Sequence, residues 1–428
     1  MSPPRGVRAI LAKAPSDVVI LSALRTPICR AYKGRLRDAY PEELLASVLR
    51  ATRASVPELD PARVEDVAVG VVLSELGGSK AARMALNHAG FPNETSLFTV
   101  NRACASSLQG IAVLAAQIRA GAVGAGIGAG MESMTRNYGT RAVPADLWPT
   151  LRAEGAREDV RDCVMPMGLT AERVARRFGV SRGDQDAFAR VSHERAAAAR
   201  DAGHFAAETV PVTTRFVETD GGKGEGGDRG GGEAREVEIT VTRDDGIRDG
   251  VTAEALARLK PAFAADGTAT AGNSSQVSDG AAAALLMRRS LALALGLERR
   301  IMGKFVAATA VGCAPSLMGI GPALAVPRLL GQLGLAAGDV DAWELNEAFA
   351  SQALHCLRAL GLEEAWARGR VNGHGGAIAL GHPLGATGAR MVSTLMHGMG
   401  RGEGGRIGVV SMCVGTGMGM AGCFVSEA

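Results

Sequence analysis

The sequence contains little of several features that define whole classes of protein. Of its 428 residues only 4% are aromatic and seven are cysteine, and no two cysteines have the CxxC spacing of zinc or dithiol sites. So few and so scattered cysteines exclude a disulfide scaffold and indicate a reducing compartment. No uninterrupted apolar run reaches the roughly 18 residues that a membrane-spanning helix needs, so we expect no membrane span.

An excess of charge of one sign is also missing. The 47 basic and 44 acidic residues leave a formal net charge of +3, and no long basic stripe marks a nucleic-acid-binding surface. Glycine, by contrast, is abundant at 57 residues and follows no G-X-Y period. This abundance indicates tight turns and backbone packed closely against backbone or ligand. The length predicts two or three packed units.

Short apolar runs alternate with helical stretches along the first part of the chain, which is typical of βαβ units with a mostly parallel sheet. Several of these patterns return late in the sequence: Val64–Leu73 at Val340–Asn346, Gly124–Gly130 at Ile407–Met412, and the helix after Cys104 at Ala386–Met399. The likeness is architectural and not letter by letter. An internal duplication and two unrelated halves therefore both remain open.

The region from about 135 to 276 differs from the two flanking parts. Helices are predicted at Thr170–Phe178, Ser181–Asp201 and Thr252–Leu259. Within it, Asp220–Glu233 is rich in glycine and charge, which predicts a surface loop between two short strands. We assign this loop no function, because no P-loop pattern surrounds its glycines.

Four segments hold residues that chemistry can use. Cys104 stands where a strand ends and a buried helix begins, a place where N–H groups and the positive helix end favour a thiolate; the alternative is a small buried residue. His382 lies in a turn walled by glycines, and Cys413 precedes a glycine-rich loop whose N–H groups suit an oxyanion hole. Asn346 and Glu347 end a strand before a helix, where a helix cap is the alternative interpretation.

Seven sequence motifs, among them these four segments, occur in the order and spacing of one family. With them the chain resembles the thiolase family from Asp17 to Phe424, most closely its peroxisomal-type 3-ketoacyl-CoA thiolases. The motifs are VNRACASSLQ, PMGLTAERVA, TAGNSSQVSDGAAA, MGIGPALAVP, NEAFASQA, GGAIALGHPLGATGAR and SMCVGTGMG. The resemblance implies an α/β thiolase fold, in which two similar α/β halves form a layered αβαβα core with an inserted loop domain. It places the N-terminal half at 17–134 plus 277–300, the loop domain that covers CoA at 135–276, and the C-terminal half at 301–428.

The resemblance also implies roles for individual residues. Cys104 matches the acyl-accepting nucleophile, Cys413 the acid/base cysteine, and His382 the histidine that activates the nucleophile. Asn346 matches the residue that fixes a water in one oxyanion hole, and the N–H groups of Cys104 and Gly415 match a second hole. The positions that match the pantetheine channel of coenzyme A are Met167, Gly272, Ser275, Ala348 and Phe349.

The implied activity is thiolytic cleavage of a 3-ketoacyl-CoA by CoA through an acyl-cysteine intermediate, in fatty-acid β-oxidation, with no metal and no cofactor beyond CoA as substrate. The alternatives are a biosynthetic acetoacetyl-CoA thiolase and, more remotely, a non-catalytic acyl-CoA-binding protein. Pro166 disfavours the biosynthetic alternative, whose members usually have histidine there. The resemblance further implies a homodimer in the peroxisome; the cytosol is the alternative, since Arg5 and Arg8 lack the other residues of an R-L-x5-H-L signal.

Two positions depart from the family pattern. Ser107 stands where family members usually have glycine, in the first turn of the helix after Cys104. The added Cβ and hydroxyl are expected to change packing or acyl-chain space near the nucleophile. His374 adds an imidazole near the turn that carries His382, and we interpret it as a tolerated loop substitution.

Overall fold

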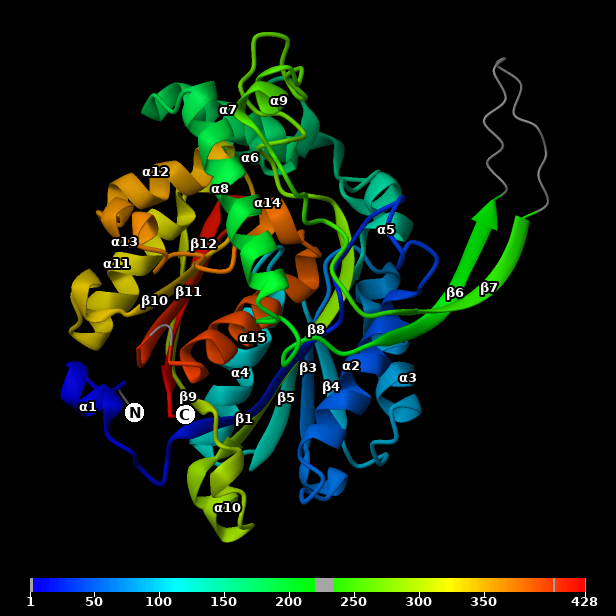
Figure 1. Ribbon diagram of the computed structural model, residues 1–428, viewed down its shortest axis with the longest axis vertical. Helices are drawn as coiled ribbons and strands as arrows, with labels where there is room; N and C mark the ends of the chain where they lie inside the picture. The colour runs from blue at the N-terminus through cyan, green and yellow to red at the C-terminus, as the bar shows by residue number, and fades with distance from the viewer. Residues whose placement is uncertain (1–2, 220–233, 403–404, 428) are drawn as a thin grey trace.

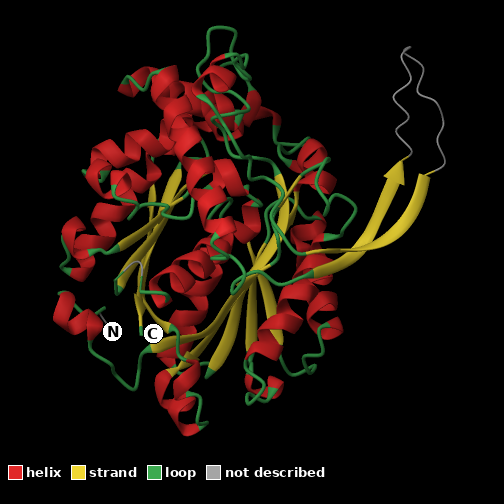
Figure 2. Cartoon of the chain, viewed as in Figure 1, coloured by secondary structure: helices red, strands yellow, loops and turns green. Residues whose placement is uncertain are grey.

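The computed structural model describes residues 3–219, 234–402 and 405–427, and in these residues ten strands form one extended mixed sheet while two form a separate hairpin (Figure 2). The strands of the large sheet are β1 (Val18–Arg25), β2 (Cys29–Arg30), β3 (Asp66–Gly70), β4 (Ser96–Val100), β5 (Ala125–Ser133), β8 (Ser278–Arg288), β9 (Gly303–Gly312), β10 (Ala342–Leu345), β11 (Ile407–Val414) and β12 (Met418–Ser426).

The large sheet consists of two halves with the same strand order. The first half runs β4-β3-β5-β8-β1 and the second runs β10-β11-β12-β9, with Val371 bridged in parallel beside β10 in the place of β4. The direction of each pairing also matches: β3–β5 and β10–β11 are parallel, whereas β5–β8 and β11–β12 are antiparallel. Antiparallel pairing of β1 with β9 joins the halves. The internal duplication is therefore present, and β3, β5 and their later echoes β10 and β11 correspond as the sequence patterns indicated.

Six helices complete a five-layered α-β-α-β-α core, which confirms the expected fold (Figure 1). The outer face of the first half is covered by α2 (Pro41–Ser55) and α3 (Ser79–His88), and that of the second half by α11 (Gly321–Leu333) and α12 (Ala350–Leu360). Between the halves lie α4 (Ser106–Ala120) and α15 (Thr387–Gly400). The central pair α4 and α15 packs in one apolar cluster with the inner faces of both halves.

Glycine lets the central helices come close to the strands and to each other. A Cβ added to Gly128 of β5 would lie 2.4 Å from Cγ1 of Ile111 on α4, and one added to Gly388 of α15 would lie 2.5 Å from the backbone nitrogen of Leu108. Such distances are too short for a real Cβ, so only glycine permits this packing. Part of the high glycine content is therefore explained by the close packing of α4 against β5 and α15.

The region inserted between the halves consists of short helices and the hairpin. Its elements are α5 (Met134–Arg141), α6 (Glu158–Arg161), α7 (Met167–Phe178), α8 (Arg182–Asp201), β6 (Val212–Thr219), β7 (Ala234–Val241) and α9 (Ala253–Ala257). The three predicted helices are present, although α7 begins earlier and α9 ends earlier than predicted. The predicted pair of strands is the β6–β7 hairpin, which extends away from the core in Figure 1. The glycine-rich segment 220–233 lies outside the described residues.

The remaining helices are α1 (Val7–Leu11), α10 (Arg289–Ala294), α13 (Glu363–Ala367) and α14 (Ala377–Leu380). After the inserted region, β8 returns to the first half between β1 and β5. This placement supports the assignment of 277–300 to the N-terminal half, while the boundaries of the three units stay a prediction. In the part of the chain that the structure describes, no helix has both the length and the apolar character needed to span a membrane.

Candidate active site

Cys104 lies in a tight turn between β4 and α4. The residue before it, Ala103, has a φ of 41°, a left-handed backbone conformation that is strained for a residue with a side chain. The hydroxyl of Ser106 holds this turn, since it accepts the N–H of Arg102 at 2.9 Å and donates to the carbonyl of Ala103 at 2.6 Å. The cysteine is therefore presented by a fixed backbone.

The pKa of the Cys104 thiol is raised to about 11, mainly by burial. The N–H groups of Gly415 and of Cys104 itself lower this pKa, as expected for groups that stabilise negative charge at the sulfur, and the nearby charge of Glu132 raises it. The N–H groups therefore act in the expected direction, toward the thiolate, but loss of solvent outweighs them. Cys104 is a thiol at neutral pH and needs a base.

Cys413 and Gly415 lie where β11 ends, directly against Cys104. Cys413 is fully buried, and burial followed by the neighbouring Cys104 raises the pKa of its thiol well above the ordinary value. The N–H of Gly415 donates a hydrogen bond to Cys104. The structure thus brings the thiols of Cys104 and Cys413 together with the N–H groups of Cys104 and Gly415.

His382 and Asn346 form the second part of the site. The imidazole of His382 is buried, its Nε2 lies 3.4 Å from Nδ2 of Asn346, and its Nδ1 lies 2.6 Å from Oγ1 of Thr387. The Thr387 hydroxyl donates its single proton to the carbonyl of Pro383 at 3.0 Å, so it accepts from His382. The proton of the neutral ring is therefore on Nδ1, and Nε2 is an acceptor, which takes the side-chain N–H of Asn346 at 3.4 Å.

Burial, followed by the charge of Arg390, lowers the pKa of His382 to about 3. The imidazole is consequently neutral throughout the physiological pH range, with Nε2 able to accept a proton. The carboxylate of Glu132 places this turn beside the nucleophile, since it accepts the N–H of Gly385 and its charge also acts on Cys104.

Asn346 is tied to the strand of the second cysteine. Its N–H donates to the carbonyl of Ser411 on β11 at 2.9 Å. Its amide oxygen Oδ1 is buried and has no hydrogen-bond partner among the described residues, so an acceptor is available to a ligand at this point.

The adjacent Glu347 holds three chain segments together, an arrangement called the clamp below. The interpretation of Asn346 and Glu347 as a helix cap is wrong. The carboxylate of Glu347 accepts hydrogen bonds from Asn372, Ser192 and the N–H of Ile378, while α12 begins later with Phe349 as its N-cap. Burial raises the pKa of Glu347, and the bonds from Ser192 and Asn372 lower it in part. Three segments from different parts of the chain are thereby held together behind Asn346.

The residues predicted to line the CoA channel gather on one side of Cys413. Ala348, Phe349 and Cys413 share an apolar cluster against which Met167 packs. Ser275 donates its N–H to the carbonyl of Ala348 at 3.0 Å. Gly272 lies further along the same loop, where an added Cβ would lie 2.5 Å from Leu259. The channel side is therefore built from the inserted region and the second half.

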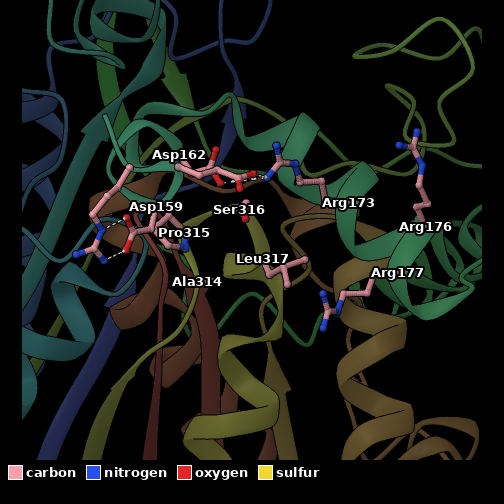
Figure 3. Close-up of a pocket in the computed structure, with 11 residues that line it drawn as sticks. Asp159, Asp162, Arg173, Arg176, Arg177, Ala314, Pro315, Ser316 and Leu317 are labelled. Carbon is pink, nitrogen blue, oxygen red and sulfur yellow. Dashed lines mark hydrogen bonds and ion pairs between the residues drawn. The ribbon is translucent and has the colours of Figure 1, made fainter. Parts of the chain in front are cut away.

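A surface cavity of about 750 Å³ lies beside the segment that precedes Met318, a residue of the cluster around Cys413. Figure 3 shows the ion pair of Arg173 with Asp162 at this cavity. A second ion pair joins Arg157 to Asp159. None of the residues predicted for catalysis or CoA binding lines this cavity. The candidate active site is therefore the cluster around Cys104 and not this cavity.

Sequence reasoning missed two residues of the site and left two open. It missed Glu132, whose only signal is a single carboxylate near the end of a strand of Gly, Ala and Met, and it missed Thr387, within the segment quoted for His382. Ser107 is fully buried, and its Oγ accepts the N–H of Ala389 on α15 at 2.9 Å.

His374 lies at the other end of α15 from His382. Its Nε2 lies 3.0 Å from Nη2 of Arg401, which follows the helix, and its ring packs edge-on to His204. At about 1.5 Å per residue, the length of α15 separates it from the turn of His382. This placement supports the interpretation of His374 as a tolerated substitution.

Comparison with known proteins gives one consistent answer. The family model "Thiolase, N-terminal domain" matches residues 18–290, and "Thiolase, C-terminal domain" matches residues 299–426. The chain is 49% identical over 411 residues to 3-ketoacyl-CoA thiolase 2, peroxisomal, of Arabidopsis thaliana, covering 95% of this chain and 84% of the relative. It is 46% identical over 426 residues to the peroxisomal 3-ketoacyl-CoA thiolase of Yarrowia lipolytica, covering 100% and 97%. The crystal structure of the dimeric peroxisomal thiolase of Saccharomyces cerevisiae superposes with a TM-score of 0.85 at 38% identity, covering 98% of this chain and 100% of that one.

Proposed function

The chain belongs to the thiolase family, and from this premise we propose how its own residues carry the reaction. Its activity is that of a 3-ketoacyl-CoA thiolase, an acetyl-CoA C-acyltransferase of peroxisomal fatty-acid β-oxidation. The substrates are a 3-ketoacyl-CoA and CoA, and the products are acetyl-CoA and an acyl-CoA shortened by two carbons. Met167, Gly272, Ser275, Ala348 and Phe349 line the channel for the pantetheine arm.

The first step forms an acyl-enzyme. Nε2 of His382 takes the proton of the Cys104 thiol, and the thiolate attacks the 3-keto carbon of the substrate. The bond between C2 and C3 then breaks, and its electron pair remains on C2 as the enolate of acetyl-CoA. The Cys413 thiol protonates C2, which releases acetyl-CoA and leaves Cys413 as a thiolate.

Two sets of donors stabilise the oxygens that become negative. The Nε2–H of protonated His382 and a water held by Asn346 serve the enolate oxygen of the thioester. The N–H groups of Cys104 and Gly415 serve the oxygen of the acyl group on Cys104. Such fixed donors are usually a large part of catalysis in acyl transfer, because they need no reorganisation as charge develops.

The second step transfers the acyl group to CoA. The Cys413 thiolate takes the proton of the incoming CoA thiol, and the CoA sulfur attacks the acyl–Cys104 thioester. Cys104 leaves as a thiolate and recovers its proton from His382. The protons therefore balance over the cycle, and both cysteines return to the protonated state that their raised pKa values favour.

The single observation that carries this proposal is the protonation of His382. Its Nδ1–H is bonded to Thr387 and its pKa is lowered to about 3, so Nε2 is unprotonated and can accept a proton. Acetoacetyl-CoA and a longer 3-ketoacyl-CoA, each mixed with CoA, test the proposal through the loss of the Mg²⁺-enolate absorbance. Cys104→Ala should abolish the loss, and mass spectrometry of the wild type should find the acyl group on Cys104. Acylation of any other cysteine would refute the assignment.

We also propose that the protein is a homodimer, as the similar yeast structure is described to be. Strand β4 is the last strand on its side of the sheet, within the described residues, so its outer edge is open to pairing. Near this edge Leu76 and Met84 are 78% and 71% exposed, so two large apolar side chains are available to a partner subunit. Sedimentation of Leu76→Glu with Met84→Glu should show the monomer, and an unchanged dimer would place the interface elsewhere.

The relatives named above are peroxisomal by name, and we propose the same compartment for this protein. Imaging of a tagged full-length form tests this, with a cytosolic signal as the contradicting result.

A further inference from the structure

Two buried side chains of the first half contact the segment that follows His382 in the second half. The N–H of Gly385 donates to Oε2 of Glu132 at 3.0 Å, and the N–H of Ala389 donates to Oγ of Ser107 at 2.9 Å. Thr387, which bonds His382, lies between these two points. The segment is therefore held on both sides of the residue that orients the base.

Glu132 ties this segment to the end of β3. Besides Gly385, its carboxylate accepts the N–H groups of Val72 and Leu73, each at 3.2 Å. Its side chain is fully buried on β5, and its carboxylate accepts hydrogen bonds from three backbone N–H groups. A buried carboxylate bonded in this way fixes the loops that supply its donors, because each donor removed would leave charge unsatisfied.

Ser107 ties the same segment to the helix of the nucleophile. Ala389 lies in the first turn of α15, where N–H groups have no acceptor within their own helix. Ser107, the third residue after Cys104, lies in the first turn of α4, so its hydroxyl supplies that acceptor from the neighbouring helix. Where the resemblance predicts a bare glycine, this chain has a hydrogen bond between the two helix ends.

The backbones around these bonds are already in contact. A Cβ added to Gly70 would lie 2.4 Å from the nitrogen of Ser107, and one added to Gly130 would lie 2.2 Å from the carbonyl oxygen of Gly385. Packing this close leaves little freedom perpendicular to the helices. The two hydrogen bonds then fix how the segment lies along them.

We propose that Ser107, together with Glu132, is a positioning residue that sets the place of His382 relative to Cys104. The proposal rests on the thiolase mechanism above for its consequence in turnover. Its structural content is independent: the serine hydroxyl joins the first turn of the nucleophile helix to the first turn of the helix that follows the base.

Ser107→Ala and Ser107→Gly in the full-length enzyme test this proposal. Both remove the acceptor of the Ala389 N–H, and the glycine variant has the residue that the resemblance predicts, so it should fold. We expect kcat to fall about 10-fold with KM within about two-fold of the wild type, since small displacements of a catalytic group cost rate more than binding. Alkylation of Cys104 by iodoacetamide at pH 8 should slow by a similar factor.

The matched control is Ser393→Ala. Ser393 is also a buried serine of the central helices, and its hydroxyl donates to the carbonyl of Ala23, away from the turn of His382. This variant should lose stability without changing kcat or alkylation. Wild-type kcat and wild-type alkylation in both Ser107 variants would overturn the proposal. If the wild type itself fails to cleave 3-ketoacyl-CoA, the proposed mechanism fails, whereas the alkylation rates still decide the role of Ser107.

Discussion

The hydroxyl of Thr387 lies 2.6 Å from Nδ1 of His382 and donates its own proton to the carbonyl of Pro383. A carbonyl can only accept, so this bond assigns the proton of the imidazole to Nδ1 and leaves Nε2 as the base. One threonine therefore decides which nitrogen of the imidazole carries the proton. The choice would be lost with a side chain of the same shape and no hydroxyl.

Thr387→Val removes that acceptor while it preserves the volume of the side chain. We expect kcat to fall roughly 10- to 100-fold, because general-base catalysis depends on the orientation and protonation of the base. The KM for 3-ketoacyl-CoA should change little. Thr394→Val is the matched control, since Thr394 is a buried threonine of the same helix that bonds Glu208 instead. Steady-state kinetics of both variants give the answer, and equal losses in both would contradict a specific role for Thr387.

His382→Ala should slow the alkylation of Cys104 by iodoacetamide strongly at pH 7 and less as the pH rises. The pKa of Cys104 is raised to about 11, so near neutral pH the thiolate forms mainly with the help of the base. Between pH 7 and pH 10 the rates of variant and wild type should converge, because hydroxide then removes the proton. Peptide mapping must separate Cys104 from the exposed Cys163. Parallel pH profiles for the two proteins would exclude His382 as the activating base.

Glu132→Gln should change how stability depends on pH. Burial raises the pKa of Glu132 to about 7, so between about pH 4.5 and pH 7 the folded protein holds a proton that the unfolded chain releases. Stability of the wild type therefore falls as pH rises through this window, and the variant lacks this fall. Between pH 4.5 and pH 7, the unfolding free energy of Glu132→Gln should therefore rise relative to that of the wild type by about 3 kcal/mol, at 1.36 kcal/mol per pKa unit.

The charged or titratable groups that act on Glu132 are Asp279 on the neighbouring strand β8 and the thiol of Cys104. Both are present in the wild type and in Glu132→Gln, so their own contributions largely cancel in the difference. Urea unfolding at several pH values between 4.5 and 8 measures it. A difference that does not vary with pH would show that Glu132 is ionised throughout.

Glu347→Ala should both destabilise the protein and reduce turnover. Its carboxylate joins Ser192, Asn372 and Ile378 behind Asn346, so removal leaves buried donors without an acceptor, at a cost of about 1–3 kcal/mol each. The exposed Glu364 pairs only at the surface with Arg368, and Glu364→Ala should cost less than about 1 kcal/mol. Thermal melting and kcat distinguish the two variants. A Glu347 variant as stable and active as Glu364→Ala would refute the clamp.

The sequence predicted the parts of this site that depend on local order along the chain. Cys104 before α4, Cys413 at the end of β11 and the turn of His382 all lie where strand, glycine and helix patterns placed them. The roles of Glu132 and Thr387 were not predicted, because hydrogen-bond partners from distant segments depend on how closely the backbones pack. The net rise of the Cys104 pKa was not predicted, because a helix end can be seen in a sequence, whereas the depth of burial that opposes it cannot.

The duplicated strand order places Glu132 and Cys413 at the same position of the repeated unit. Each is the residue before the last of its strand, β5 or β11, and each is paired with a glycine on the following antiparallel strand. The first half has at this position a carboxylate that holds loops, and the second half has the thiol that transfers protons in the proposed mechanism. The two halves thus share a backbone plan but carry different side chains at this position. The proposed nucleophile Cys104 belongs to the first half, whereas the proposed proton-transfer residues His382 and Cys413 belong to the second.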